Sequence, residues 1–177
     1  MKPRIKVEFT VGFLTLIACF CMLIKSQGIG LPLWAIFVGW AEYFGLGAST
    51  DLFKKALPSV IPGAVCACIC LKLMSLPAFA SWGFWNGAVW ITLTVFLLMW
   101  LLDIPNFNVG LVGFNGYTVV FIIATMGPTA YPVWGCGAII SSAVWSCLAL
   151  AIGYVMGYLS VLLQFPKKDE TDISSDK

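Results

Sequence analysis

Six long apolar segments, separated by short breaks, are the feature that most constrains how this chain can fold. A helix that crosses a bilayer needs about 20 mostly apolar residues, because the hydrocarbon core is about 30 Å thick. Each segment approaches or exceeds that length, so we predict an all-α integral membrane protein with six transmembrane helices. The predicted spans are residues 9–24, 32–48, 56–76, 79–102, 108–126 and 132–163.

The breaks between the spans contain Gly, Pro, Ser or Asp, which favour turns over continued helix. The remaining regions follow from composition, because the end of the chain is polar and charged and offers no apolar face to bury. We therefore expect a cytoplasmic N-terminus (1–8), a single six-helix membrane domain (9–165) and a disordered cytoplasmic tail (166–177).

Composition argues against several classes of function. Charged residues make up only 10% of the chain, against about 25% in ordinary soluble domains. No basic patch interleaved with aromatic residues supports nucleic-acid binding, and the absence of His removes His-based haem, metal and proton-relay sites. The run Cys66, Cys68, Cys70 lacks the spacing of metal ligands. We interpret it as small buried side chains, and we expect no metal and no cofactor.

The distribution of Lys and Arg predicts the orientation, since cytoplasmic loops carry the excess of positive charge. With six spans, three basic clusters fall on one side, and only Lys25 and Lys72 fall towards the other. Both termini are therefore predicted to be cytoplasmic. The three clusters are Lys2, Arg4 and Lys6; Lys54 and Lys55; and Lys167 and Lys168.

The start of the chain has a competing interpretation. The run Leu16-Ile17-Ala18-Cys19 is similar to a bacterial lipobox, in which Cys19 would be lipidated after cleavage. However, the apolar run continues past Cys19 to Ile24, which favours a retained span.

The chain is similar to itself at an ungapped offset of 74 residues, in two separate blocks. Because each half has three spans, an odd number, the second half must enter the membrane from the opposite side. We therefore predict a 3+3 inverted repeat, an architecture of transporters and channels whose site lies near the midplane between the halves. The alternative is the duplication of a scaffold. The paired blocks are Phe37–Tyr43 with Leu111–Tyr117 and Leu57–Ala64 with Tyr131–Ala138, in halves of about 9–76 and 79–163.

Glu42 lies near the middle of the second predicted span, where a carboxylate costs at least about 2.5 kcal/mol. The neighbouring Gly39 and Gly45 allow another helix to approach closely, so we expect Glu42 to point into the protein. Its functional interpretation is a substrate or proton site. The alternative is a structural hydrogen-bond anchor for a neighbouring helix.

Four further polar residues are candidates for lining a pathway together with Glu42. Tyr43 and Tyr117 are counterparts in the repeat, Asn115 lies one position from the counterpart of Glu42, and Asn86 lies in the fourth span. An inverted arrangement would bring these groups together near the midplane. For each Asn the alternative is a hydrogen bond between helices, worth about 1 kcal/mol.

Small residues at helical spacing predict close helix packing. Three glycines recur every three residues from Gly110, and a stripe of small residues runs along the last span from Ser142 to Gly157. The glycines expected to pack against other helices are Gly39, Gly45, Gly113, Gly116, Gly153 and Gly157.

The run from Gly39 to Gly45 resembles the G-x-x-x-Y-F signature of a bacterial inner-membrane family known as domain of unknown function 1097. The resemblance covers the chain from the first span to Gly157 and implies a multi-pass protein of the inner membrane. Separately, the run from Gly113 to Tyr117 is similar to the G-x-x-G-Y-N stretch of urea transporters, although Thr118 replaces the final Asn. That similarity implies small neutral solutes.

These patterns predict a small-solute channel or transporter, whose partners are the lipid bilayer and an unidentified small molecule. Six helices leave little room for both a pathway and its wall, so we also expect a homo-oligomer. The alternative is a non-transporting scaffold or subunit that binds a partner protein. An enzyme is not expected, because the chain lacks Ser-His, Cys-His, H-E-x-x-H and paired intramembrane carboxylates. A hydrated cavity at Glu42 and Asn115 would favour transport, whereas capping in a dry core would favour the scaffold.

Overall fold

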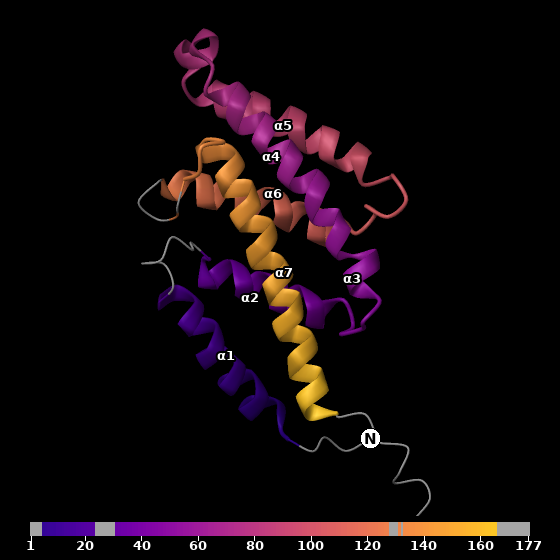
Figure 1. Ribbon diagram of the computed structural model, residues 1–177. Helices are drawn as coiled ribbons and strands as arrows, with labels where there is room; N and C mark the ends of the chain where they lie inside the picture. The colour runs from indigo at the N-terminus through magenta and orange to yellow at the C-terminus, as the bar shows by residue number, and fades with distance from the viewer. Residues whose placement is uncertain (1–4, 24–30, 128–130, 132, 166–177) are drawn as a thin grey trace, which may run out of the picture.

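The computed structural model describes residues 5–23, 31–127, 131 and 133–165. These residues form seven α-helices and two 3-10 turns and contain no strand, which confirms the predicted all-α class (Figure 1). The predicted tail (166–177) and several of the basic residues used for orientation lie outside the described part. The elements are α1 (Val7–Leu23), α2 (Leu33–Gly45), α3 (Leu52–Lys55), η2 (Leu57–Ser59), α4 (Val60–Met74), η3 (Pro77–Trp82), α5 (Phe84–Leu101), α6 (Gly110–Met126) and α7 (Ala138–Gln164).

Each predicted span overlaps one of the longer helices, but several helix ends differ from the prediction. The second helix ends at Gly45 rather than Ala48, because Gly47 and Ala48 take positive φ values of 100° and 53° that stop it. The last helix begins at Ala138, directly after Gly137, whose φ is 91°. The third span is interrupted at Pro58, where η2 separates α3 from α4.

Three stretches of the described chain are long and apolar enough to cross a membrane. They are Leu52–Met74, Phe84–Leu101 and Ala138–Gln164, while Val7–Phe20 and Gly110–Met126 are shorter apolar helices. With 13 residues, α2 is about 20 Å long and does not by itself reach across the hydrocarbon core. In contrast α7, with 27 residues, is about 40 Å long and fits the core only when tilted.

Large apolar side chains cover much of the outer surface. On α5, Phe84 is 81% exposed, Phe96 78% and Trp100 70%. An aqueous surface rarely carries contiguous apolar side chains of this size, whereas lipid tails solvate them well. The apolar helices are those of a helical membrane protein.

The long helix α7 runs through the middle of the fold (Figure 1) and packs against α1, α2, α4 and α6. Its most extensive contact is with α2. The most extensive contact of α4 is with α6, and α5 packs on the outer side of α4. The buried apolar residues accordingly form two clusters. One centres on α1, α2 and α7, and the other on α4, α5 and α6.

α2 and α7 cross where glycines remove side chains from the contact. A Cβ added to Gly39 of α2 would meet the backbone of Leu150. A Cβ added to Gly153 of α7 would meet the Ile36 carbonyl and lie 2.7 Å from the Trp40 nitrogen. Ordinary contacts of a Cβ atom are 3.4–4 Å. Only glycine therefore fits at the two positions, and the two backbones touch.

α4 and α6 cross in the same manner. A Cβ added to Gly63 of α4 would meet the Gly113 carbonyl and lie 2.8 Å from the Tyr117 nitrogen, and one added to Gly116 of α6 would lie 2.7 Å from the Val60 oxygen. Here too a backbone, rather than a flexible side chain, closes the space over each glycine.

The two crossings correspond residue by residue. On α2 and α6 the matching positions differ by 77 residues, as in Gly39 with Gly116, and on α4 and α7 by 90 residues, as in Gly63 with Gly153. The residues that the glycines face obey the same offsets. The offset of 74 that the sequence blocks suggested is therefore three residues, nearly one helical turn, smaller than the structural offset of 77 on α2 and α6. It also pairs Gly63 with Gly137, which instead precedes α7 and faces open space.

Most of the glycines expected to pack against other helices do so. Gly39, Gly116 and Gly153 face backbone, a Cβ on Gly157 would lie 2.6 Å from the Tyr43 ring, and one on Gly113 would lie 2.7 Å from the Leu102 side chain. Gly45 differs, because it ends α2 and has no atom near its Cβ position.

Candidate functional site

Glu42 of α2 and Asn115 of α6 are joined directly. The Asn115 Nδ2 donates a hydrogen bond of 2.5 Å to Oε1 of Glu42. Glu42 is 3% exposed, so its carboxyl group lies in the interior, while Asn115 is half-buried. The bond connects α2 to α6 through two residues that lie 73 positions apart in the sequence.

The second carboxyl oxygen of Glu42 has no such partner. Oε2 is buried and accepts no hydrogen bond, and the buried hydroxyl of Tyr154 on α7 is likewise without a hydrogen-bond partner. The two groups nevertheless face each other within reach of a hydrogen bond from the Tyr154 hydroxyl to the Glu42 carboxylate, although its geometry is not well formed. We call Glu42, Asn115 and Tyr154 the Glu42 cluster; it joins α2, α6 and α7.

The glycine crossing of α2 and α7 explains why Glu42 and Tyr154 meet. Glu42 lies three residues after Gly39, and Tyr154 directly follows Gly153. Because no side chain separates α2 from α7 at these glycines, the residues beside the crossing approach each other closely. Gly39 and Gly153 therefore bring the polar residues together, although neither glycine contributes a polar group to the site.

Tyr43 lies beside the cluster in an aromatic group. Its ring is fully buried and packs edge-on against Tyr154, with ring centroids 5.9 Å apart, and Phe53 and Tyr158 extend the group. Its hydroxyl has no hydrogen-bond partner. Tyr43 therefore contributes packing more than polarity to this region.

Tyr117 belongs to the second apolar cluster rather than to the Glu42 cluster. Its hydroxyl and the Thr94 Oγ1 of α5 form a buried hydrogen bond of 2.9 Å. This arrangement links α6 to α5 and satisfies both hydroxyls inside an apolar environment.

Asn86 lies at the start of α5, where the Nδ2 donates a 3.0 Å hydrogen bond to the Met74 carbonyl. That carbonyl belongs to the last residue of α4, whose final carbonyls have no partner within the helix. Asn86 thus ties the two ends of the α4–α5 connection.

Of the five predicted lining residues, the structure brings Glu42 and Asn115 into contact and places Tyr43 beside them, whereas Tyr117 and Asn86 lie in two other places. Sequence reasoning missed Tyr154, although its position next to Gly153, in the stripe of small residues, marked it as adjacent to a helix contact.

The environment of the cluster meets neither the dry nor the hydrated alternative in full. Glu42 is capped on one oxygen by Asn115 and is shielded from solvent, yet its other oxygen is uncapped. The described residues contain no group of three or more His, Cys, Asp or Glu side chains suited to an ion.

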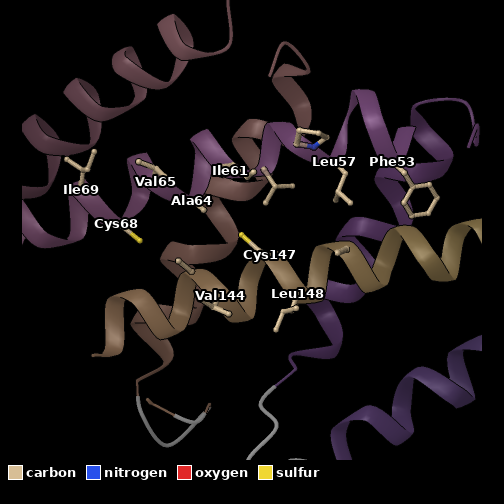
Figure 2. Close-up of a pocket in the computed structure, with 14 residues that line it drawn as sticks. Phe53, Leu57, Ile61, Ala64, Val65, Cys68, Ile69, Val144, Cys147 and Leu148 are labelled. Carbon is tan, nitrogen blue, oxygen red and sulfur yellow. The ribbon is translucent and has the colours of Figure 1, made fainter. Parts of the chain in front are cut away.

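A large groove lies elsewhere, between α4 and α7, and Figure 2 shows the sulfur atoms of Cys68 and Cys147 pointing into the space between the two helices. Its volume is about 750 Å³, and its lining runs from Phe53 to Ile69 on one side and from Ala143 to Ala151 on the other. None of the predicted site residues lines it.

Comparison with known proteins gives one positive result. A family model described as "Protein of unknown function (DUF1097)" matches residues 9–164. No curated protein and no solved structure matches the chain, so the similarity to urea transporters gains no support.

Proposed function

Since the chain belongs to the DUF1097 family, whose function is unknown, we propose its function from the site itself: a small-solute channel or transporter, without enzymatic activity, whose pathway passes the Glu42 cluster. The chain would lie in the inner membrane with both termini in the cytoplasm. Its six apolar segments would form the 3+3 inverted repeat, and copies of the chain would assemble as a homo-oligomer.

The two glycine crossings support the inverted repeat. Each crossing joins one helix of the first half to one helix of the second, α2 to α7 and α4 to α6, and the facing residues correspond at constant offsets. Exchange of the halves converts one crossing into the other. Transporters built on such repeats place their sites where the halves meet.

The short helix α2 supports the position of the pathway. It has 13 residues and occupies the same place, second of three, in its half as α6 does in the other. Short or interrupted helices point to a binding site in this architecture. These two helices carry Glu42 and Asn115.

The observation that carries the proposal is the buried pair of the Glu42 carboxyl and the Tyr154 hydroxyl, which face each other without a well-formed hydrogen bond. A buried polar atom without a good partner costs about 1–3 kcal/mol, and such atoms require a reason, for example an ion, a water or a catalytic role. A proton taken up by the Glu42 carboxyl would give this pair a second donor, which supports a proton-linked pathway.

A second candidate follows from the other carboxyl oxygen. The direct bond from Asn115 in a dry interior is what a helix-joining anchor requires, and it favours a membrane scaffold or subunit that binds a partner protein. The two candidates differ in what Glu42→Gln should do. A glutamine keeps an acceptor for Asn115 and gains a donor for Tyr154, so it preserves the anchor but removes the titratable group.

The deciding experiment is solute flux into proteoliposomes across a pH step, with short carboxylates and small neutral solutes. For a transporter, the wild type conducts, Glu42→Gln loses the pH dependence, and the matched variant Tyr43→Phe keeps it, since it removes only an unpartnered hydroxyl. If neither wild type nor variant moves any solute while both stay folded, transport is refuted and the scaffold is retained.

A further inference from the structure

The groove between α4 and α7 continues beyond the part that Figure 2 shows. A second hollow of about 690 Å³ shares Cys68 and Ile69 with it and extends to Lys72 and to the start of α7 at Ala138. The two hollows form one channel-like recess along α4, which we call the α4–α7 groove.

The α4 part of the α4–α7 groove is about as long as one leaflet of the hydrocarbon core. From Val60 to Lys72 is 12 residues of one continuous helix, or about 18 Å at 1.5 Å per residue, against about 15 Å for half of the core. Its lining is apolar, and several of its side chains are open to the surroundings, among them Ile61 at 54% and Val65 at 47%.

Positive charge marks the ends of this apolar lining. Lys72 itself lines one end and has no ion-pair partner among the described residues. At the opposite end Lys54 is exposed, and Lys55 is held by Asp51 at 3.5 Å. The groove therefore offers a long apolar surface and an unpaired cation at the depth of a lipid headgroup.

We propose that the α4–α7 groove binds an anionic phospholipid, with its phosphate at Lys72 and one acyl chain along α4. Half of the hydrocarbon core is about 15 Å, the length of about ten helical residues. A chain that starts at Lys72 thus passes Ile69 and Val65 and ends near Ile61, all of which line the groove.

The charge at Lys72 selects this occupant over a neutral lipid or a polar solute. A lysine at an anionic membrane surface is worth about 1 kcal/mol, and the rest of the lining offers a solute almost no hydrogen-bonding group. The site goes beyond the proposed transport function and is independent of the Glu42 cluster. With a cytoplasmic N-terminus, the third span runs outward and Lys72, near the end of α4, lies at the outer leaflet. Only this choice of leaflet rests on the orientation proposed above.

The test is native mass spectrometry of the full chain in non-ionic detergent, titrated with phosphatidylglycerol or phosphatidylcholine of identical acyl chains. We expect about fivefold tighter binding of phosphatidylglycerol, which is about 1 kcal/mol expressed as a ratio of dissociation constants. Lys72→Gln should abolish this preference, Lys72→Arg should keep it, and the matched variant Lys54→Gln at the other end should leave it unchanged.

A second pair of variants tests the acyl chain. Val65→Trp fills the groove and should weaken binding of both lipids, whereas Leu93→Trp, on the outer face of α5 where Leu93 is 54% exposed, should not. Equal binding of the two lipids by the wild type, or a preference that survives Lys72→Gln, overturns the proposal. A lipid-free dimer that Val65→Trp dissociates would also overturn it, because a second copy would then fill the groove.

Discussion

Replacing Gly63 by alanine should loosen the α4–α6 crossing. The new Cβ would meet the Gly113 carbonyl and lie 2.8 Å from the Tyr117 nitrogen, against an ordinary contact of 3.4–4 Å. Both atoms belong to backbone, so no rotamer change relieves the contact and the helices must separate. Overpacking costs about 1–3 kcal/mol of stability, and we expect a cost at the upper end of this range. The higher helix propensity of alanine over glycine offsets about 1 kcal/mol of it. The net loss of about 2 kcal/mol corresponds to a melting temperature lower by about 4–8 °C.

The chain provides a matched control for this substitution. Gly87, like Gly63, is the fourth residue of its helix, but its Cβ position lies 3.6 Å from the end of the flexible Met74 side chain. Gly87→Ala should therefore leave the melting temperature unchanged or raise it slightly.

Thermal unfolding in detergent can be followed with a thiol-reactive fluorophore, because Cys66 and Cys70 are fully buried in α4 and react once the crossing opens. Gly153→Ala, at the corresponding position of the other crossing, should lower the melting temperature by a similar amount. Equal melting temperatures for Gly63→Ala and Gly87→Ala would show that the backbones do not touch, and the argument for the crossings would fail.

Three further outcomes follow from the polar contacts. Asn115→Leu removes the donor to Glu42 and should cost about 1–3 kcal/mol of stability, measured by unfolding in mixed micelles. The double variant Asn115→Leu with Glu42→Leu should lose less stability than Asn115→Leu alone, because no buried carboxylate is then left without its partner. An equal or larger loss in the double variant would contradict the contact. Thr94→Val and Tyr117→Phe remove the same hydrogen bond, so each should lower stability by about 1 kcal/mol and the pair by no more than either alone; additive losses would refute the bond. Asn86→Ala frees the carbonyl at the end of α4, so hydrogen exchange should accelerate in the connection to α5 but not in α7; unchanged exchange would show that the bond does not hold the connection.

The all-α class and the approximate place of every long helix could be predicted, because apolar length is a property of the sequence alone. Helix ends were less predictable. The early end of α2 depends on positive φ values at Gly47 and Ala48, and alanine gives no local sign of that conformation.

Two of the three residues of the Glu42 cluster were within reach of the sequence. A carboxylate in an apolar span and an asparagine at nearly the matching place in the other half pointed to each other, and the structure joins them. Tyr154 was not within reach, because its approach depends on which face of α7 crosses α2. Tyr117 and Asn86 found closer partners, Thr94 and the end of α4, which no spacing pattern reveals.

The crossings also have a consequence for biogenesis. α2 and α4 are synthesised before the helices they cross, so once α4 has left the ribosome the backbone faces at Gly39 and Gly63 have no counterpart yet. Until α6 and α7 emerge, those faces must be occupied by lipid or by an insertion factor. The two halves are thus obligate complements: neither is expected to persist alone, and two fragments divided between α4 and α5 should assemble when they are co-expressed.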